Sequence, residues 1–132
     1  MAGTHSPSAV EHISPEAFAP TLRRLEKAIE AAGMTVFARI DHAAGARDVG
    51  MTMPPTVVLF YGNPRGGTPI MLATPGAALD LPLKVLVRED TDGRTIVAFH
   101  LVTPLLEAAG VPGELAVRLQ PAQRVLVDAL RP

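Results

Sequence analysis

Residues able to do chemistry gather at two places in the sequence, the pair Asp41-His42 and the loop from Gly62 to Thr68. A histidine beside a carboxylate can serve as a general acid or base near neutral pH. In the loop, Arg65 offers a guanidinium suited to carboxylates and phosphates, and Thr68 stands before a proline, as a helix cap often does. Free N–H groups at such a helix start favour an anion. The pattern suggests an acid–base residue and an anion site.

The loop begins like a Walker A phosphate loop but departs from that motif at its second half. Gly62 and Gly67 have the required separation, yet Thr68 occupies the lysine position and Pro69 the Ser/Thr position. Such a loop directs backbone N–H groups at phosphate, and Pro64 and Pro69 each lack this group. We therefore predict that this segment is not a nucleotide-binding loop.

Both places also have a purely structural interpretation. In the loop, Asn63-Pro64 and Gly66-Gly67 are turn formers, and Thr68 needs only to cap a helix. Asp41 is suited to cap a helix at 42–49, which would leave His42 solvated or in one structural hydrogen bond. That histidine follows a strand whose alternate residues we expect to be buried: Met34, Val36, Ala38 and Ile40. The sequence leaves the structural and functional interpretations open.

Composition excludes several functions. The 132 residues contain no cysteine, which removes disulfides, thiolate catalysis and cysteine-based metal sites. No two histidines have zinc-binding spacing, so no metal site is expected. The net charge of −1, the lack of tryptophan and the single tyrosine disfavour nucleic acid as a partner. No apolar run approaches the ~20 residues of a membrane helix and the N-terminus lacks a secretory pattern, so we expect a cytoplasmic protein.

Apolar periodicity and turn residues predict an α+β domain. Strands are predicted at 34–40, 56–61, 83–89 and 95–101, the last two as a hairpin around Asp90 to Gly93. Helices are predicted at 15–32, 42–49, 103–110, 113–119 and 121–131, with a broken helical segment at 68–79. We expect a flexible tail at 1–12 and a single domain at 13–132, in which helices pack against a small sheet of about four strands.

Four blocks of the sequence together resemble one known family. They read IDHAAGA (40–46), PPTVVLFYGNPRGGTPIM (54–71), ALDLPLKVLVRED (78–90) and DGRTIVAF (92–99). In this order they resemble the bacterial and archaeal family called domain of unknown function 302, DUF302. The resemblance implies a small α+β domain that is often dimeric and has no established biochemical role. The family's Asp-His pair falls on Asp41 and His42, while Tyr61 replaces the usual phenylalanine before the loop.

These observations favour a homo-oligomeric binding module, expected to be a dimer, for a small ligand. Arg65 and the helix start would favour an anionic ligand. The candidate ligand-binding residues are Asn63, Arg65, Gly67 and Thr68. Self-association is expected because the charged fraction of 19% lies below the usual ~25%. One alternative is an enzyme in which His42, with Asp41, acts beside that anion site. A second is a structural or interaction protein. No cofactor is indicated.

Overall fold

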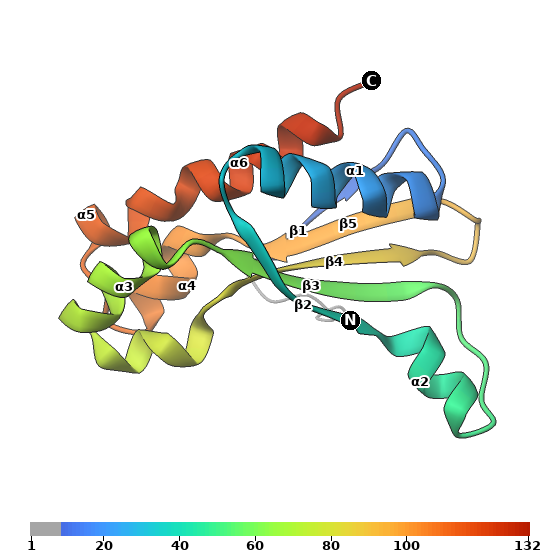
Figure 1. Ribbon diagram of the computed structural model, residues 1–132, viewed down its shortest axis with the longest axis horizontal. Helices are drawn as coiled ribbons and strands as arrows, with labels where there is room; N and C mark the ends of the chain where they lie inside the picture. Colours follow the sequence, from blue (N-terminus) through green and yellow to red (C-terminus); the bar gives the residue numbers. More distant parts are fainter. Residues whose placement is uncertain (1–8) are drawn as a thin grey trace, which may run out of the picture.

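The computed structural model describes residues 9–132 and arranges them as a sheet with helices packed over one of its faces (Figure 1). Each strand is antiparallel to its neighbours, in the order β1-β5-β4-β3-β2. The strands are β1 (Ala9–Ile13), β2 (Thr35–Asp41), β3 (Thr56–Gly62), β4 (Leu83–Glu89) and β5 (Thr95–His100). The predicted α+β class is confirmed, and the sheet has five strands where about four were expected.

The additional strand is β1, in a region that was predicted to be a flexible tail. Its residues pair with β5, with Val10 opposite Phe99 and Ile13 opposite Ile96. The tail prediction is therefore wrong for residues 9–12, and residues 1–8 lie outside the described part of the chain. The strand was missed because Glu11 and His12 interrupt its apolar pattern. Its partner β5 supplies the pairing that so short a strand lacks by itself.

Helices α1 (Phe18–Ala31) and α6 (Gln120–Ala129) lie against each other over the sheet, and α1 contacts β2 and β4 beneath it. The remaining helices gather at the ends of the sheet: α2 (His42–Asp48), α3 (Pro64–Ala73), the 3-10 helix η1 (Pro75–Asp80), α4 (Val102–Ala108), α5 (Gly113–Ala116) and η2 (Val117–Leu119). In residues 9–132, no helix combines the length and the apolar composition needed to cross a membrane.

The core lies between the sheet and the α1–α6 layer. Along β3, Val57, Leu59 and Tyr61 are buried while the residues between them are only half-buried. This alternation is the period of two expected for a strand with one covered face. Leu25 of α1 and Leu126 of α6 belong to the same buried cluster as these residues, and both are fully buried. Strand β3 is therefore fixed by packing along its whole length, up to the loop that follows it.

A β-bulge in β2 overturns the predicted burial of that strand. The register with β3 shifts between Val36, which lies opposite Tyr61, and Ala38, which lies opposite Phe60. The inserted residue is Phe37, and an insertion of one residue moves every later side chain to the other face of the sheet. Val36 thus shares the helix-covered face, whereas Ala38 and Ile40 do not, and Ile40 remains 44% exposed.

Beyond β2, the chain leaves the sheet as an arm, residues 42–55, made of α2 and the loop that returns to β3 (Figure 1). Asp41 caps α2, as predicted, since its Oδ1 accepts a hydrogen bond from the backbone N–H of Ala44 at 2.9 Å. The returning loop carries exposed apolar side chains, with Val49 71% and Met51 65% exposed. The arm thus presents apolar surface away from the core.

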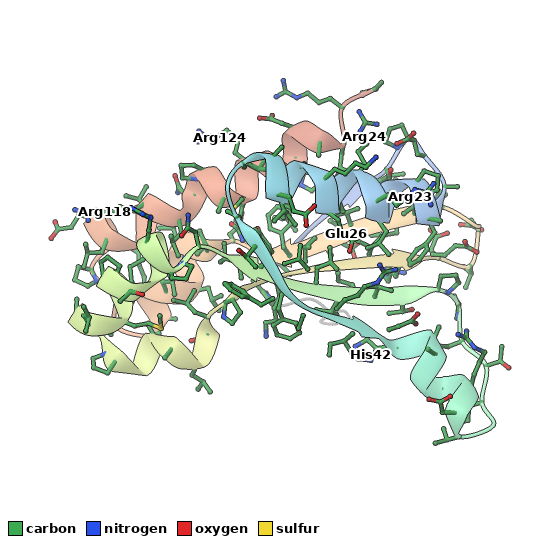
Figure 2. All side chains as sticks on the ribbon, viewed as in Figure 1. Arg23, Arg24, Glu26, His42, Arg118 and Arg124 are labelled. Carbon is green, nitrogen blue, oxygen red and sulfur yellow. The ribbon has the colours of Figure 1, made fainter. Side chains whose placement is uncertain are left out.

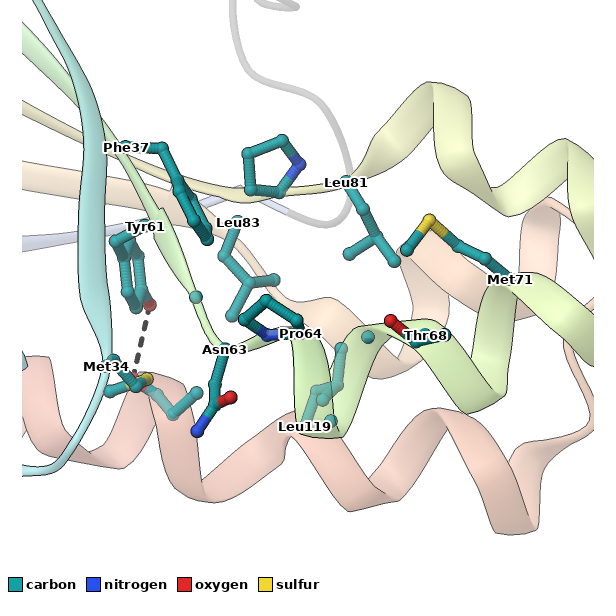
Figure 3. Close-up of a pocket in the computed structure, with 15 residues that line it drawn as sticks. Met34, Phe37, Tyr61, Asn63, Pro64, Thr68, Met71, Leu81, Leu83 and Leu119 are labelled. Carbon is teal, nitrogen blue, oxygen red and sulfur yellow. Dashed lines mark hydrogen bonds between the residues drawn. The ribbon is translucent and has the colours of Figure 1, made fainter.

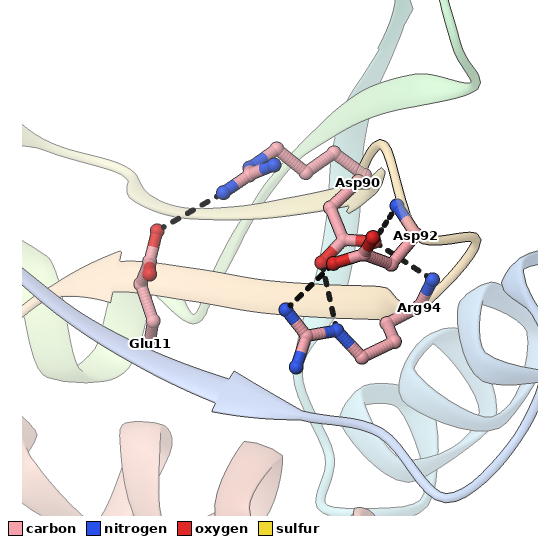
Figure 4. Close-up of polar contacts among 5 residues, drawn as sticks. Glu11, Asp90, Asp92 and Arg94 are labelled. Carbon is pink, nitrogen blue, oxygen red and sulfur yellow. Dashed lines mark hydrogen bonds and ion pairs between the residues drawn. The ribbon is translucent and has the colours of Figure 1, made fainter.

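The hairpin between β4 and β5 is closed by the side chain of Asp90 (Figure 4). Its Oδ1 accepts hydrogen bonds from the backbone N–H groups of Asp92 and Arg94, each at 2.9 Å, and its Oδ2 contacts Arg94 Nε at 2.9 Å. The hydrogen bond from the Arg94 backbone is the main reason that the pKa of Asp90 is lowered, with the Arg94 guanidinium adding to the effect. The charged carboxylate therefore stabilises this turn.

Replacing Asp90 by asparagine should remove part of the acid dependence of folding. A carboxyl with a lowered folded-state pKa stabilises the protein above its ordinary pKa, and this stabilisation is lost as the pH falls through the folded-state value. Asp90→Asn keeps the Oδ1 acceptor and loses the charge. We expect a lower thermal midpoint at neutral pH and a smaller difference from the wild type near pH 2. The control is Asp92→Asn, whose contact with Arg94 is longer, at 3.4 Å. If the thermal midpoints of Asp90→Asn and the wild type change with pH in the same way, this role of Asp90 is contradicted.

Candidate ligand-binding site

A pocket of about 430 Å³ opens where β2, β3, the start of α3, the segment before β4 and the start of α6 meet (Figure 3). Its walls are mainly apolar side chains, among them Met34, Phe37, Tyr61, Met71, Leu81 and Leu119. The size and the apolar lining are those of a small-molecule site. The pocket uses the loop that the sequence singled out, but adds residues from four other segments.

Helix α3 begins earlier than predicted, at Pro64. Asn63 is its N-cap, because the Asn63 Oδ1 accepts from the backbone N–H of Arg65 at 2.9 Å. Proline suits the first helical position that follows. The prediction of a helix start at Thr68 is therefore wrong: Asn63-Pro64 is a complete start signal, and the two glycines interpreted as a turn are helical. Pro69 lies inside the helix.

The early start leaves no free donors for an anion in the first turn of α3. Pro64 has no N–H, and the N–H of Arg65 is bound to the Asn63 side chain. The N–H groups of Gly66 and Gly67 both donate to the Asn63 carbonyl, at 2.9 and 3.0 Å. The Arg65 side chain is exposed and does not line the pocket. The geometry that was expected to bind an anion is absent from this helix start.

Three of the four predicted ligand-binding residues do line the pocket: Asn63, Gly67 and Thr68. Gly67 contributes its backbone to the pocket wall. A Cβ added at this glycine would face the pocket side chains, 3.7 Å from Met71 Cε and 3.9 Å from Leu81 Cδ1. Figure 3 shows the Thr68 hydroxyl on the pocket side of α3. No hydrogen bond of that hydroxyl is found within residues 9–132, so it remains available to a ligand.

Asp41 and His42 lie at the other end of β2 from the pocket (Figure 2). Thr35 of β2 lies opposite Gly62 beside the pocket, whereas Asp41 lies opposite Val57. Six residues of extended strand, at about 3.3 Å each, put the Asp-His pair about 20 Å from the loop. Both side chains are exposed. The predicted combination of His42 with Arg65 and Thr68 in one site is therefore wrong.

Sequence reasoning missed Tyr61, which joins two walls of the pocket. It is fully buried, and its hydroxyl donates to the Ala122 carbonyl of α6 at 3.2 Å. Burial raises the pKa of the Tyr61 phenol well above its ordinary value. Its place in the alternating pattern of β3, directly before the loop, is the signal that points to it. Within residues 9–132, no three His, Asp or Glu side chains are grouped as a metal site.

A family model and a solved structure match nearly the whole of this chain. The chain matches the sequence model of the family described as "Domain of unknown function DUF302" over residues 10–131. Its fold is also that of an uncharacterized conserved DUF302 protein from Bacillus stearothermophilus. That crystal structure aligns with a TM-score of 0.85 and 19% identity, covering 96% of this chain and all of the other.

Curated relatives match over a shorter segment. A protein named fluoride-specific ion channel FluC 1, from Brucella suis biovar 1 (strain 1330), is 40% identical over 81 residues, or 61% of this chain and 32% of the relative. A FluC 1 protein of Brucella abortus biovar 1 (strain 9-941) matches equally well over 30% of its own length. The chain thus spans about a third of the length of these relatives.

Tyr61 should not ionise while the protein is folded. It is the only tyrosine and the chain has no tryptophan, so ultraviolet absorbance follows its phenolate directly. Because the folded-state pKa is raised, stability is full below the ordinary value near 10 and falls as the pH rises above it. We expect phenolate to form only with unfolding. Tyr61→Phe should cost about 1 kcal/mol near pH 7 and weaken this alkaline loss. A phenolate that titrates near pH 10 with circular dichroism unchanged would contradict the burial argument.

Proposed function

Because the chain belongs to the DUF302 family, which is defined without an activity, we propose a function from its own site: a binding module that holds a small molecule in the pocket at the start of α3. The observation that carries this proposal is the pocket itself, about 430 Å³ in size and walled by apolar side chains from five segments. Such a cavity keeps apolar surface exposed to water, and a ligand that covers this surface binds with a hydrophobic gain.

The enzyme alternative loses its support from the separation of the candidate residues. A general acid or base must reach the reacting group within hydrogen-bond distance or through one water. His42 stands about 20 Å from the loop, and Arg65 is not among the residues that line the pocket. The polar side chains that line the pocket are those of Asn63, Thr68 and Tyr61, and none of them titrates near neutral pH. The Tyr61 hydroxyl and the Asn63 Oδ1 are already hydrogen-bonded, so Thr68 is the group that can orient a ligand.

The names of the curated relatives raise fluoride as a second candidate ligand, but this site does not favour it. The match covers about a third of those proteins. Fluoride is a small, strongly hydrated anion, and its binding requires donors or cations to replace water. The pocket lining contains no cationic side chain, and the N–H groups of the first α3 turn are already bonded. We therefore do not extend fluoride binding to this pocket.

We also propose that the module works as a homodimer that associates through the arm and β2. The support is the concentration of exposed large apolar side chains between residues 37 and 53, namely Phe37, Ile40, Val49, Met51 and Met53. A cluster of exposed large apolar side chains in one short stretch of the chain is a feature of interaction surfaces. Strand β2 is also an edge strand, which leaves backbone groups free for a partner. The cytoplasmic location expected from the sequence stays a prediction.

Filling the pocket should abolish binding of a small uncharged probe. In Gly67→Leu, the added side chain extends from the helical backbone into the pocket, past Met71 and Leu81. We expect at least about tenfold weaker binding of N-phenyl-1-naphthylamine, measured by its fluorescence, because the probe and the leucine compete for one space. The control is Gly45→Leu in α2, where no atom lies within 4 Å of an added Cβ. The proposal fails if the wild type does not bind the probe, or if both variants bind it as the wild type does.

A charge in the arm should dissociate the dimer. Met51→Glu places a carboxylate in the proposed interface, where burial without a partner is costly. We expect a wild-type dimer by light scattering after gel filtration, and a monomer for the variant at the same concentration. Leu79→Glu is the control, since Leu79 is 88% exposed on η1, outside the arm. A monomeric wild type would contradict self-association, and an equal effect of the two variants would contradict its location.

A further inference from the structure

We infer that the ligand of this pocket is an uncharged aromatic molecule of about two fused rings that carries one hydroxyl-sized polar group, held by Thr68. The inference rests on the proposed function and names the chemical class that the site selects. Four features of the pocket lead to it: the absence of charge in its lining, its volume, the methionine and aromatic side chains of its walls, and the position of the one uncommitted hydroxyl.

The lining selects against charge. None of the side chains that form the pocket is ionisable at neutral pH, because Tyr61 is the one titratable residue among them and burial raises its pKa. The first-turn N–H groups of α3, which would otherwise attract an anion, are bonded to Asn63. An ion that enters loses much of its hydration and meets no side chain of opposite charge, at a cost of several kcal/mol. Uncharged molecules avoid this cost.

The volume sets the size. The pocket volume of about 430 Å³ is many times the share of about 30 Å³ that one water molecule takes in the liquid, so the pocket holds a molecule of many non-hydrogen atoms. A fused pair of six-membered rings with one substituent, of about 11 non-hydrogen atoms, fits into this space whole. A single ring would leave much of the apolar wall exposed to water.

The walls suit flat rings. Met34 and Met71 line the pocket together with the rings of Phe37 and Tyr61 (Figure 3). Thioether sulfur makes favourable contacts with aromatic rings, and the unbranched methionine side chain adapts its shape to the ligand. The ring of Phe37, which is 49% exposed, adds edge-to-face or offset contacts, while the fully buried Tyr61 supports the wall from behind. An aromatic ligand gains from Met34, Met71 and Phe37, whereas an aliphatic one gains only from burial.

Thr68 provides the one uncommitted side-chain hydroxyl. The Tyr61 hydroxyl already donates to Ala122, and the Asn63 Oδ1 already accepts from Arg65. The Thr68 hydroxyl lies on the pocket side of α3 and has no hydrogen-bond partner within residues 9–132. A ligand hydroxyl can both donate to it and accept from it. This single contact would orient an otherwise apolar molecule.

The methionines provide a direct test, because two of them line the pocket and two lie in or near the arm. Protein labelled with ¹³C at the methionine methyls is titrated with 1-naphthol and, separately, with 1-naphthoate near pH 7. We expect 1-naphthol to shift the Met34 and Met71 signals and to leave Met51 and Met53 unchanged. The naphthoate anion, of similar size, should bind at least about tenfold more weakly, since its charge is not compensated.

Thr68→Val tests the polar contact, since valine keeps the shape and removes the hydroxyl. We expect 1-naphthol to bind about three- to tenfold more weakly to the variant, as for the loss of one neutral hydrogen bond. Naphthalene has no hydroxyl and should bind the variant and the wild type equally. An equal loss for both ligands, or no loss for 1-naphthol, would overturn the role of Thr68.

The outcomes separate this inference from the proposed function. If 1-naphthoate shifts Met34 and Met71 at concentrations as low as 1-naphthol does, the ligand class is wrong while small-molecule binding stands. If neither compound moves these two signals up to its solubility limit, the binding function itself is overturned. A response of Met51 and Met53 instead would move the site to the arm and also overturn the inference.

Discussion

The cap that Asn63 forms on α3 is the interaction on which the site depends. The side-chain Oδ1 of Asn63 accepts a hydrogen bond from the N–H of Arg65, and the backbone carbonyl of Asn63 accepts from the N–H groups of Gly66 and Gly67. One residue thereby fixes where the helix begins and holds its first turn. The same bonds consume the donors that would attract an anion. The choice between an anion site and an apolar pocket is therefore made by the geometry of a helix cap.

Strand β3 holds this cap in place. Its alternate side chains, from Val57 to Tyr61, are buried beneath the helical layer, so the strand cannot shift without disrupting the core. Tyr61 ends the series and bonds to the Ala122 carbonyl of α6, which ties the pocket wall to a second element. A rigid strand and a capped helix therefore meet at the loop. Pockets built between such elements keep their shape without a ligand.

The bulge at Phe37 gives β2 two roles. Before the bulge, Val36 shares the helix-covered face with Tyr61, and after it Ala38 and Ile40 share the opposite face. Phe37 itself lines the pocket yet remains 49% exposed. A single inserted residue thus connects the ligand site with the surface proposed for self-association. Bulges near functional sites commonly redirect a side chain in this way.

The sequence by itself determined the α+β class, four of the strands, the hairpin around Asp90, the cap at Asp41 and the family, because these follow from local periodicity, turn residues and motif order. It also singled out Asn63, Gly67 and Thr68. Only the tertiary structure decided that β1 joins the sheet, that His42 lies far from the loop and that Met34, Tyr61 and Leu119 share a pocket with it. Local propensity depends on neighbours in the chain, whereas strand pairing, register shifts and cavity walls depend on residues that meet only after folding.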